Sequence, residues 1–269
     1  MSMNSVNTNR QAIFALQSLN QSNTDLGSVQ KRVSTGLRVA DARDDGGAFA
    51  VASAVRSDIA GVTAVNEQLG GIKGVLQTTF AALTQVTDTM KQARQVLTRL
   101  ADGAISADQR TQYNAQYQSL ATQIEDFIED ANYNGTTLLA GADIETIRNE
   151  AGDNFTILAE TAVDLQIINT TYADAAAART YLIGDFADTE TAVSSALNKF
   201  GATMQYVENQ ISYNTKKNDA LTDGLGALVD ADLAKESANL QALQTRQQLG
   251  IQTLSLANQG PQVLLSLFR

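Results

Sequence analysis

The sequence predicts a mainly α-helical protein with long coiled-coil helices, whose N- and C-terminal helices pair, and with a small β insert. Three observations support this fold class. The 269 residues include one proline, Pro261, so helices can run far without interruption. Apolar residues recur every three or four positions over most of the chain, which is the spacing of one helix face. Between about 140 and 188 this spacing gives way to an alternation, which is typical of strands.

The first 40 residues contain a heptad pattern that predicts a coiled-coil seam. Six of its eight a and d positions are apolar, and the two polar residues among them are predicted to fix the register. The eight positions are Ala12, Leu16, Leu19, Asn23, Leu26, Gln30, Val33 and Leu37.

A second apolar stripe predicts one helix from Val51 to Leu100. Such a helix would be about 75 Å long. Four glycines lie between residues 61 and 74, and each costs about 1 kcal/mol of helix stability relative to Ala. Packing must therefore compensate for them, or the helix bends there.

The following elements are bounded by capping and turn signals. Ser106 and Gln109 predict a capping box at the start of a helix that Asn134-Gly135 closes. Another helix is predicted from about 193 to 228. Strands are expected at 156–158 and 163–167, with turns such as that at 151–153.

The last helix carries two apolar stripes, whereas a helix docked on one partner needs only one. We therefore expect several neighbours, most simply other copies of this chain, and we expect both termini to be largely disordered until the chains assemble. One stripe holds Leu233, Leu240, Leu243, Ile251, Leu254, Leu265 and Phe268, and the other holds Ala238, Ala242, Leu249, Leu256, Val263 and Leu267.

The composition excludes several kinds of site. The chain has no Cys, His or Trp, which removes disulfides, thiol catalysis, His-based triads and nearly all zinc sites. We interpret Asp44-Asp45-Gly46-Gly47 as a turn or helix start rather than a cation loop, and Asp230, Asp232 and Glu236 as helix capping rather than an acid/base pair. We therefore expect no enzyme activity, no cofactor, and no catalytic or metal-binding residues.

The charge distribution argues against nucleic acid as a partner. The net charge is −10, and residues 41–229 hold 12 basic and 25 acidic residues, or 12 − 25 = −13. Phosphate binding needs the opposite sign. No run of about 18 apolar residues suggests a membrane span, and the first thirty residues lack the apolar segment of a cleaved signal peptide.

Several long segments resemble bacterial flagellin, in the same order and at both ends of the chain. They are SVNTNRQAIFALQSLN near the N-terminus, VSTGLRVADARDDGGAFAVASAVRSDI at 33–59, YNGTTLLAG at 133–141, and DADLAKESANLQALQTRQQLGIQTLSLANQGPQVLLSLFR at 230–269. The resemblance covers roughly the first 140 and the last 80 residues. The short stretch between them is similar to that of alphaproteobacterial flagellins, which lack large outer domains.

This resemblance implies a structural protein that polymerises into the extracellular filament used for swimming motility. It also implies export through the flagellar type III system, with the export apparatus, an export chaperone, and the hook-associated and filament-cap proteins as partners. The alternative within the same superfamily is a hook-filament junction protein. Gln92 stands where an arginine is expected beside Arg94, which argues against recognition by an innate-immune Toll-like receptor.

These observations divide the chain into three regions. Residues 1–40 and 230–269 are expected to form the coiled-coil filament core, 41–139 and 189–229 a helical bundle, and 140–188 an outer β insert. The predicted subunit-interface residues are Leu16, Leu19, Leu26, Val33, Leu37, Leu240, Leu243, Leu249, Ile251, Leu254, Leu256, Val263, Leu265, Leu267 and Phe268.

Overall fold

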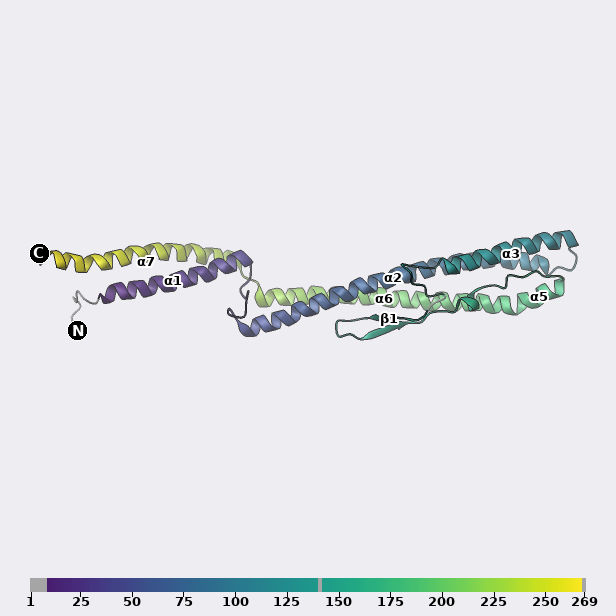
Figure 1. Ribbon diagram of the computed structural model, residues 1–269, viewed down its shortest axis with the longest axis horizontal. Coiled ribbons are helices and arrows are strands. Elements are labelled where there is room, and N and C mark those ends of the chain that lie inside the picture. The colour runs from purple at the N-terminus through teal and green to yellow at the C-terminus, as the bar shows by residue number, and fades with distance from the viewer. Residues whose placement is uncertain (1–8, 140–141, 268–269) are drawn as a thin grey trace. The chain divides into compact units, whose positions relative to one another are not determined.

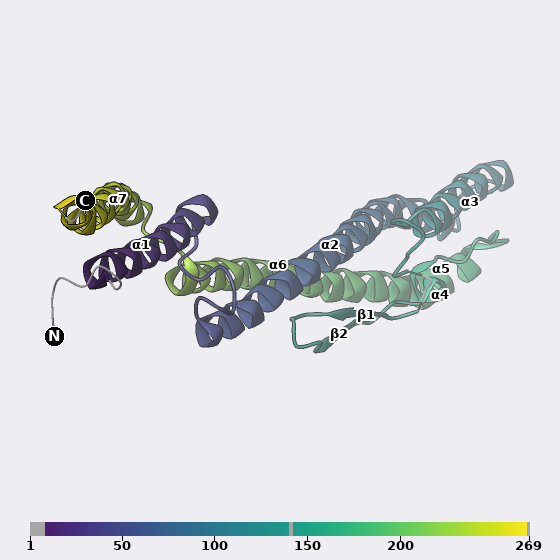
Figure 2. The same ribbon diagram turned by 60° about the vertical axis from the view of Figure 1, so that its left-hand side comes forward.

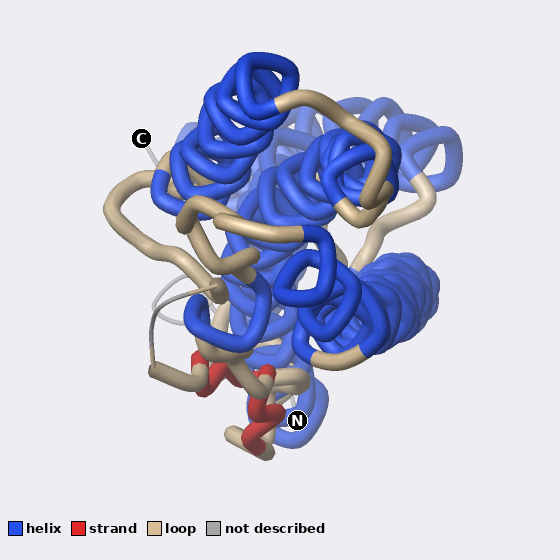
Figure 3. The backbone as a smooth tube through the Cα atoms, turned by 90° about the vertical axis from the view of Figure 1, so that its right-hand side faces the viewer, coloured by secondary structure: helices blue, strands red, loops and turns tan. Residues whose placement is uncertain are grey.

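The structure, a computed structural model, describes the backbone of residues 9–139 and 142–267. Long helices dominate it, and its strands form one antiparallel hairpin (Figures 1 and 3). The predicted fold class is therefore confirmed. In chain order the elements are α1 (Arg10–Thr35), α2 (Gly46–Leu100), α3 (Ala107–Glu129), β1 (Ile144–Ile147), β2 (Asn154–Ile157), α4 (Ala162–Leu165), α5 (Ala175–Ile183), α6 (Asp185–Val229) and α7 (Leu233–Leu267).

The chain divides into two compact units. The terminal unit takes the residues up to Ser57 and those from Ala220 onward, and the central unit takes Asp58–Asp219. The divisions fall inside α2 and α6, so these two helices contribute to both units.

In the terminal unit, the chain after α1 is tied to the chain before α7. The side chain of Asn9 caps α1, and Gly36 ends it at a φ of 71°, a conformation that favours glycine. The backbone N–H of Arg38 then donates to the carbonyl of Val229 at 2.7 Å. Val39 and Val229 are buried here together with Ala52. This tie places the end of α1 beside the start of α7.

The turn or helix start predicted at residues 44–47 is confirmed, because a turn ends at Asp44 and α2 begins at Gly46. Hydrogen bonds and ion pairs of acidic side chains stabilise it. The Asp45 carboxylate accepts from the N–H of Ala48 at the start of α2. The Asp44 carboxylate accepts from the N–H of Ala40 at 3.0 Å and from the Lys31 ammonium at 2.8 Å. The hydrogen bond from Lys31 lowers the pKa of Asp44 to about 2. The pKa of Lys31 is raised by its hydrogen bonds to Asp41, at 2.8 Å, and to Asp44.

The core of the central unit is formed by α2, α3 and α6. The predicted stripe of α2 is buried at most of its positions from Val62 to Leu100, whereas Phe80 is 36% exposed. Tyr117 of α3 and Phe200 of α6 are fully buried against it. The capping box of Ser106 and Gln109 is present as predicted.

The strand predicted at 163–167 is wrong, because this segment starts with the short helix α4 and continues without regular structure. Leu165 and Ile167 are nevertheless buried. Two tyrosines hold the chain here: the hydroxyl of Tyr117 donates to the carbonyl of Ile168, and the N–H of Ile168 donates to the hydroxyl of Tyr181. Burial raises the pKa of both tyrosines. The apolar alternation thus reflects packing against side chains rather than pairing with a strand.

The β1–β2 hairpin is fastened to α6 through its turn. The side-chain amides of Gln210 and Asn214 donate to the carbonyl of Arg148 at 3.1 and 3.3 Å, and Lys217 forms an ion pair with Glu150. A Cβ at Gly61 of α2 would stand 3.0 Å from the Cβ of Glu150. This glycine therefore makes room for the turn.

Two predicted helix boundaries are wrong. Helix α3 ends at Glu129 with Asp130 as its cap, so Asn134-Gly135 does not close it. These two residues have φ values of 50° and 83° and form a tight turn, across which Tyr133 and Thr136 exchange backbone hydrogen bonds. Helix α6 starts at Asp185 rather than near 193, and it runs through its glycines to Val229.

One helix in the described part of the chain, α2, is long and apolar enough to cross a membrane by length and composition alone. Core helices of soluble proteins meet the same criteria.

The glycines of α2 allow a paired prediction. A Cβ at Gly74 would stand 2.7 Å from the ring of Tyr133, whereas a Cβ at Gly70 meets nothing within 4 Å. We expect Gly70→Ala to raise the free energy of unfolding by up to about 1 kcal/mol, because Ala favours the helix. Gly74→Ala should lower it, since the clash exceeds this gain. Urea unfolding of both variants measures the difference, and two changes of the same sign would contradict the prediction.

The charged turn should make the terminal unit sensitive to pH at both extremes. Because the pKa of Asp44 is lowered, its ionised carboxylate stabilises the fold at pH values above 3.8, the ordinary pKa of Asp. This stabilisation is lost as the pH falls toward about 2. Because the pKa of Lys31 is raised, its ammonium group stabilises the fold at pH values below 10.5. This stabilisation is lost at higher pH, where the group loses its proton. We expect the protection factor of the Ala40 amide to be constant between these limits and to fall outside them. The variant Asp44→Ala should show low protection throughout, and a wild-type-like profile would refute the role of this carboxylate.

Candidate assembly surface

The α1 and α7 helices form an antiparallel hairpin (Figures 1 and 2). Polar contacts connect them at both ends and in the middle. Arg32 lies 3.4 Å from the carboxylate of Glu236, the Gln247 amide donates to Asn23 at 2.7 Å, and the Asn9 amide donates to the carbonyl of Ala257 at 2.7 Å. Along this series the residue numbers in α1 decrease while those in α7 increase, as in an antiparallel pair. The contacts therefore fix the register of the two helices.

The side of α7 that faces α1 follows a heptad. Its residues 236, 240, 243, 247, 250, 254 and 257 are buried or half-buried. At Gly250 a Cβ would stand 3.2 Å from a methyl of Leu19, so the helices approach closely there.

Every second position of the α1 seam differs from the prediction. Residues 12, 19, 26 and 33 are buried or half-buried as expected, but their companions are 15, 22 and 29. Leu16, Asn23 and Gln30 are exposed. The predicted register marker Asn23 therefore acts from the edge of the seam, where it meets Gln247.

The structure separates the predicted interface residues into two sets. Those half-buried or buried within the chain are Leu19, Leu26, Val33, Leu37, Leu240, Leu243 and Leu254, and those exposed are Leu16, Leu249, Ile251 and Leu256. The side chains of Val263, Leu265 and Leu267, and all of Phe268, lie outside the described part of the structure.

The exposed apolar residues lie on two different sides of the hairpin. By helical periodicity, Leu249 and Leu256 lie on one side of the seam of α7 and Ile251 lies on the other. Their side chains are 56%, 69% and 55% exposed. Beside Leu249, a shallow groove lined by Ala15 and Arg246 runs between the two helices. We call the sides the Leu249 side and the Ile251 side.

Two exposed residues of α1 were not among the predicted interface residues. Phe14 is 65% exposed and lines a groove with Arg246 on the Leu249 side, and Ile13 is 59% exposed. By periodicity, Ile13 and Leu16 lie on the Ile251 side. A search that was not limited to one heptad frame would have found them, because both are large apolar residues that fall outside the seam.

The acidic residues around the start of α7 have structural partners. Asp232 accepts from the backbone N–H groups of Ala234 and Lys235, which is the capping geometry that the sequence predicted. Glu236 faces Arg32 in the seam. In the part of the chain that the structure describes, no group of three acidic side chains could hold a metal ion.

Two family models match this chain. The model of the bacterial flagellin N-terminal helical region matches residues 6–143, and that of the bacterial flagellin C-terminal helical region matches residues 185–268. The matched regions include all of α1, α2, α3, α6 and α7.

Curated relatives extend over the whole chain. Flagellin FljK of Caulobacter vibrioides is 36% identical, with 100% of each chain covered, and a flagellin of Brucella melitensis is 34% identical, with 99% of this chain and 100% of the relative covered. A solved structure of a putative flagellar hook-associated protein from Vibrio parahaemolyticus matches 70% of this chain and 100% of its own, with a TM-score of 0.60 and 13% identity. That likeness concerns the fold alone.

The contact between Asn23 and Gln247 gives a prediction for the hairpin. A hydrogen bond of this kind contributes about 0.5 to 1.5 kcal/mol. We expect Asn23→Ala and Gln247→Ala each to destabilise the α1–α7 pair by about this amount, and the double variant to be no worse than either. Hydrogen exchange of the α1 amides in the assembled protein measures the free energy of local opening. Additive losses would show that the two side chains do not interact.

Proposed function

Because the chain belongs to the bacterial flagellin family, we propose that it is a flagellar filament subunit that polymerises through the Leu249 and Ile251 sides of its α1–α7 hairpin. The exposure of Leu249, Leu256 and Ile251 carries this proposal. Apolar residues on both sides of a two-helix hairpin remain in water unless further helices cover them. Burying a Leu side chain contributes about 1.5 to 3 kcal/mol, which supplies a driving force for assembly.

The two sides of the hairpin are different surfaces, which determines the kind of assembly. A contact between the Leu249 side of one copy and the Ile251 side of the next is heterologous. Heterologous contacts produce rings or open helical polymers rather than closed dimers. A filament is the open form.

We assign the regions of the chain accordingly. Residues 1–40 and 230–269 form the filament core, 41–139 and 189–229 surround it, and 140–188 lies outermost. The acidic balance of residues 41–229 then makes neighbouring copies repel each other, so higher ionic strength promotes polymerisation.

The family relationship supports the remaining parts of the proposal. On this proposal the chain leaves the cell through the flagellar type III system, accompanied by an export chaperone. It joins a filament with hook-associated proteins at one end and cap proteins at the other. Arg94 is held by Glu190 at 2.8 Å, and Gln92 beside it is not an arginine, so we do not expect Toll-like receptor recognition.

Electron microscopy of the purified protein after a jump in salt concentration tests the function. Long homopolymers support a filament subunit. A hook-filament junction protein would not form them alone, so short rings or monomers would favour that alternative. Strong hydrogen-exchange protection of both termini in the dilute monomer would refute the expectation that they order on assembly.

The Leu249 side can be tested by introducing charge. We expect Leu249→Asp to raise the critical concentration for polymerisation by about tenfold to a hundredfold, because the lost burial corresponds to about 1.5 to 3 kcal/mol. Leu158→Asp is the matched control, since Leu158 is 53% exposed but lies in the central unit. Sedimentation of the polymer measures both variants. Equal critical concentrations for the two would contradict the assignment of this side.

A further inference from the structure

The Asn134-Gly135 turn carries a reactive pair of groups. An asparagine followed by glycine places its side-chain carboxamide next to the least hindered kind of backbone nitrogen, because glycine has no side chain. This dipeptide occurs once in the sequence. Both residues are exposed, and Asn134 lines a groove between α2 and β1. Water therefore reaches the carboxamide of Asn134.

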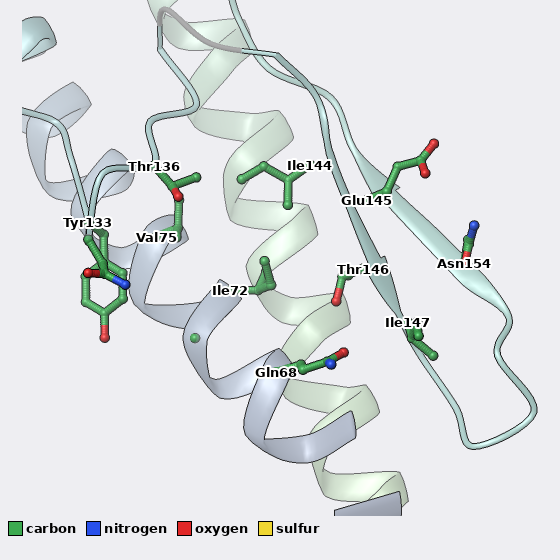
Figure 4. Close-up of a pocket in the computed structure, with 12 residues that line it drawn as sticks. Gln68, Ile72, Val75, Tyr133, Thr136, Ile144, Glu145, Thr146, Ile147 and Asn154 are labelled. Atoms are coloured by element: carbon green, nitrogen blue, oxygen red, sulfur yellow. The ribbon is translucent and has the colours of Figure 1, made fainter. Parts of the chain in front are cut away.

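Hydrogen bonds across the turn fix its backbone. The N–H of Tyr133 donates to the carbonyl of Thr136 at 2.9 Å, and the N–H of Thr136 donates to the carbonyl of Tyr133 at 3.0 Å. Figure 4 shows both residues close to Val75 of α2. The φ values of 50° at Asn134 and 83° at Gly135 are those of a mirror-image type I turn, in which ψ of the first residue is about 30°. At that value the Gly135 nitrogen does not face the carboxamide carbon of Asn134.

The nitrogen of Gly135 is also held by a side chain. The carboxamide oxygen of Asn132 accepts from the N–H of Gly135 at 2.7 Å. Asn132 is an exposed residue between the end of α3 and the turn. Rotation of the Gly135 amide toward the side chain of Asn134 would break this hydrogen bond. Asn132 therefore opposes a reaction between the Gly135 nitrogen and the Asn134 carboxamide.

We propose that Asn134 is a site of deamidation and that Asn132 controls its rate. When the turn opens, the Gly135 nitrogen loses its proton and attacks the Cγ carbon of Asn134. The new N–Cγ bond closes a succinimide ring, the Cγ–Nδ2 bond breaks, and ammonia leaves with that proton. Water then adds to one of the ring carbonyls and opens the ring. The product carries an aspartate or an isoaspartate at position 134.

The product changes the turn in two ways. An isoaspartate inserts an additional carbon atom into the main chain, which displaces Tyr133 from Thr136 and breaks their hydrogen bonds. Either product adds a negative charge to residues 41–229, where acidic residues already outnumber basic ones. Because Tyr133 packs against Gly74 of α2, the modification loosens the turn from the helix. The reaction needs only water, so it does not depend on polymerisation.

Deamidation of the full chain in mildly alkaline buffer tests the role of Asn132. We expect Asn134 to react about twofold to tenfold faster in Asn132→Ala than in the parent, because opening of the turn no longer breaks this hydrogen bond. Mass spectrometry of peptides measures the rate. Asn132→Asp is the matched control: it retains an acceptor oxygen and should react no faster than the parent. Asn169, which is exposed and lies outside the turn, should react at the same rate in all three chains.

Unfolding separates the effect of the turn from that of the local sequence. In guanidinium chloride the parent and Asn132→Ala should deamidate at the same rate, and faster than either does when folded. Equal rates for the folded and the unfolded parent would overturn the protection by the turn. Equal rates for the folded parent and folded Asn132→Ala, with the same helical circular dichroism, would overturn the role of Asn132. An unfolded parent that keeps its amide would exclude Asn134 as a site.

Discussion

The terminal unit depends on one constraint: α7 has apolar residues on more sides than α1 can cover. Leu240 and Leu243 are half-buried against α1, while Leu249 and Leu256 remain in water. The polar contacts between the helices fix their register, but each contributes only about 1 kcal/mol. These hydrogen bonds therefore fix the register of the hairpin but leave the apolar residues of its Leu249 and Ile251 sides exposed. Further helices are needed to bury those residues.

The central unit satisfies its own core, which gives it a different part in assembly. Leu69, Leu83 and Leu97 of α2 are fully buried in one core cluster with residues of α3 and α6, and Tyr117 packs against other aromatic residues. Such a core is stable within one chain. Polymerisation can then change the environment of the hairpin without refolding the rest, which keeps the ordering cost confined to the terminal residues.

The helical plan, the capping box and the turn at 44–47 could be predicted, because apolar period and capping residues act locally. The seam of α1 could be predicted only in part. Leu16 and Ala15 are adjacent, and choosing between them requires the position of α7, which is tertiary information. The same limit applies at Asn134-Gly135: the sequence predicts a turn, but whether it ends α3 or follows a further connection depends on where Tyr133 packs, which is against Gly74. Leu249 and Leu256 could be predicted as part of a second apolar stripe on the last helix. A helix that packs against several neighbours has apolar residues on several of its sides, and this pattern is visible in the sequence.

A hairpin with two unlike sides makes heterologous contacts in the proposed assembly, so the relation of one copy to the next depends on which residues the two sides present. The register between α1 and α7 then matters beyond the monomer, because a slip of one heptad at Asn23 and Gln247 would displace Leu249 and Ile251 relative to Phe14 and Leu16. Polar bonds of modest strength inside one chain thereby determine which apolar residues a neighbouring chain meets.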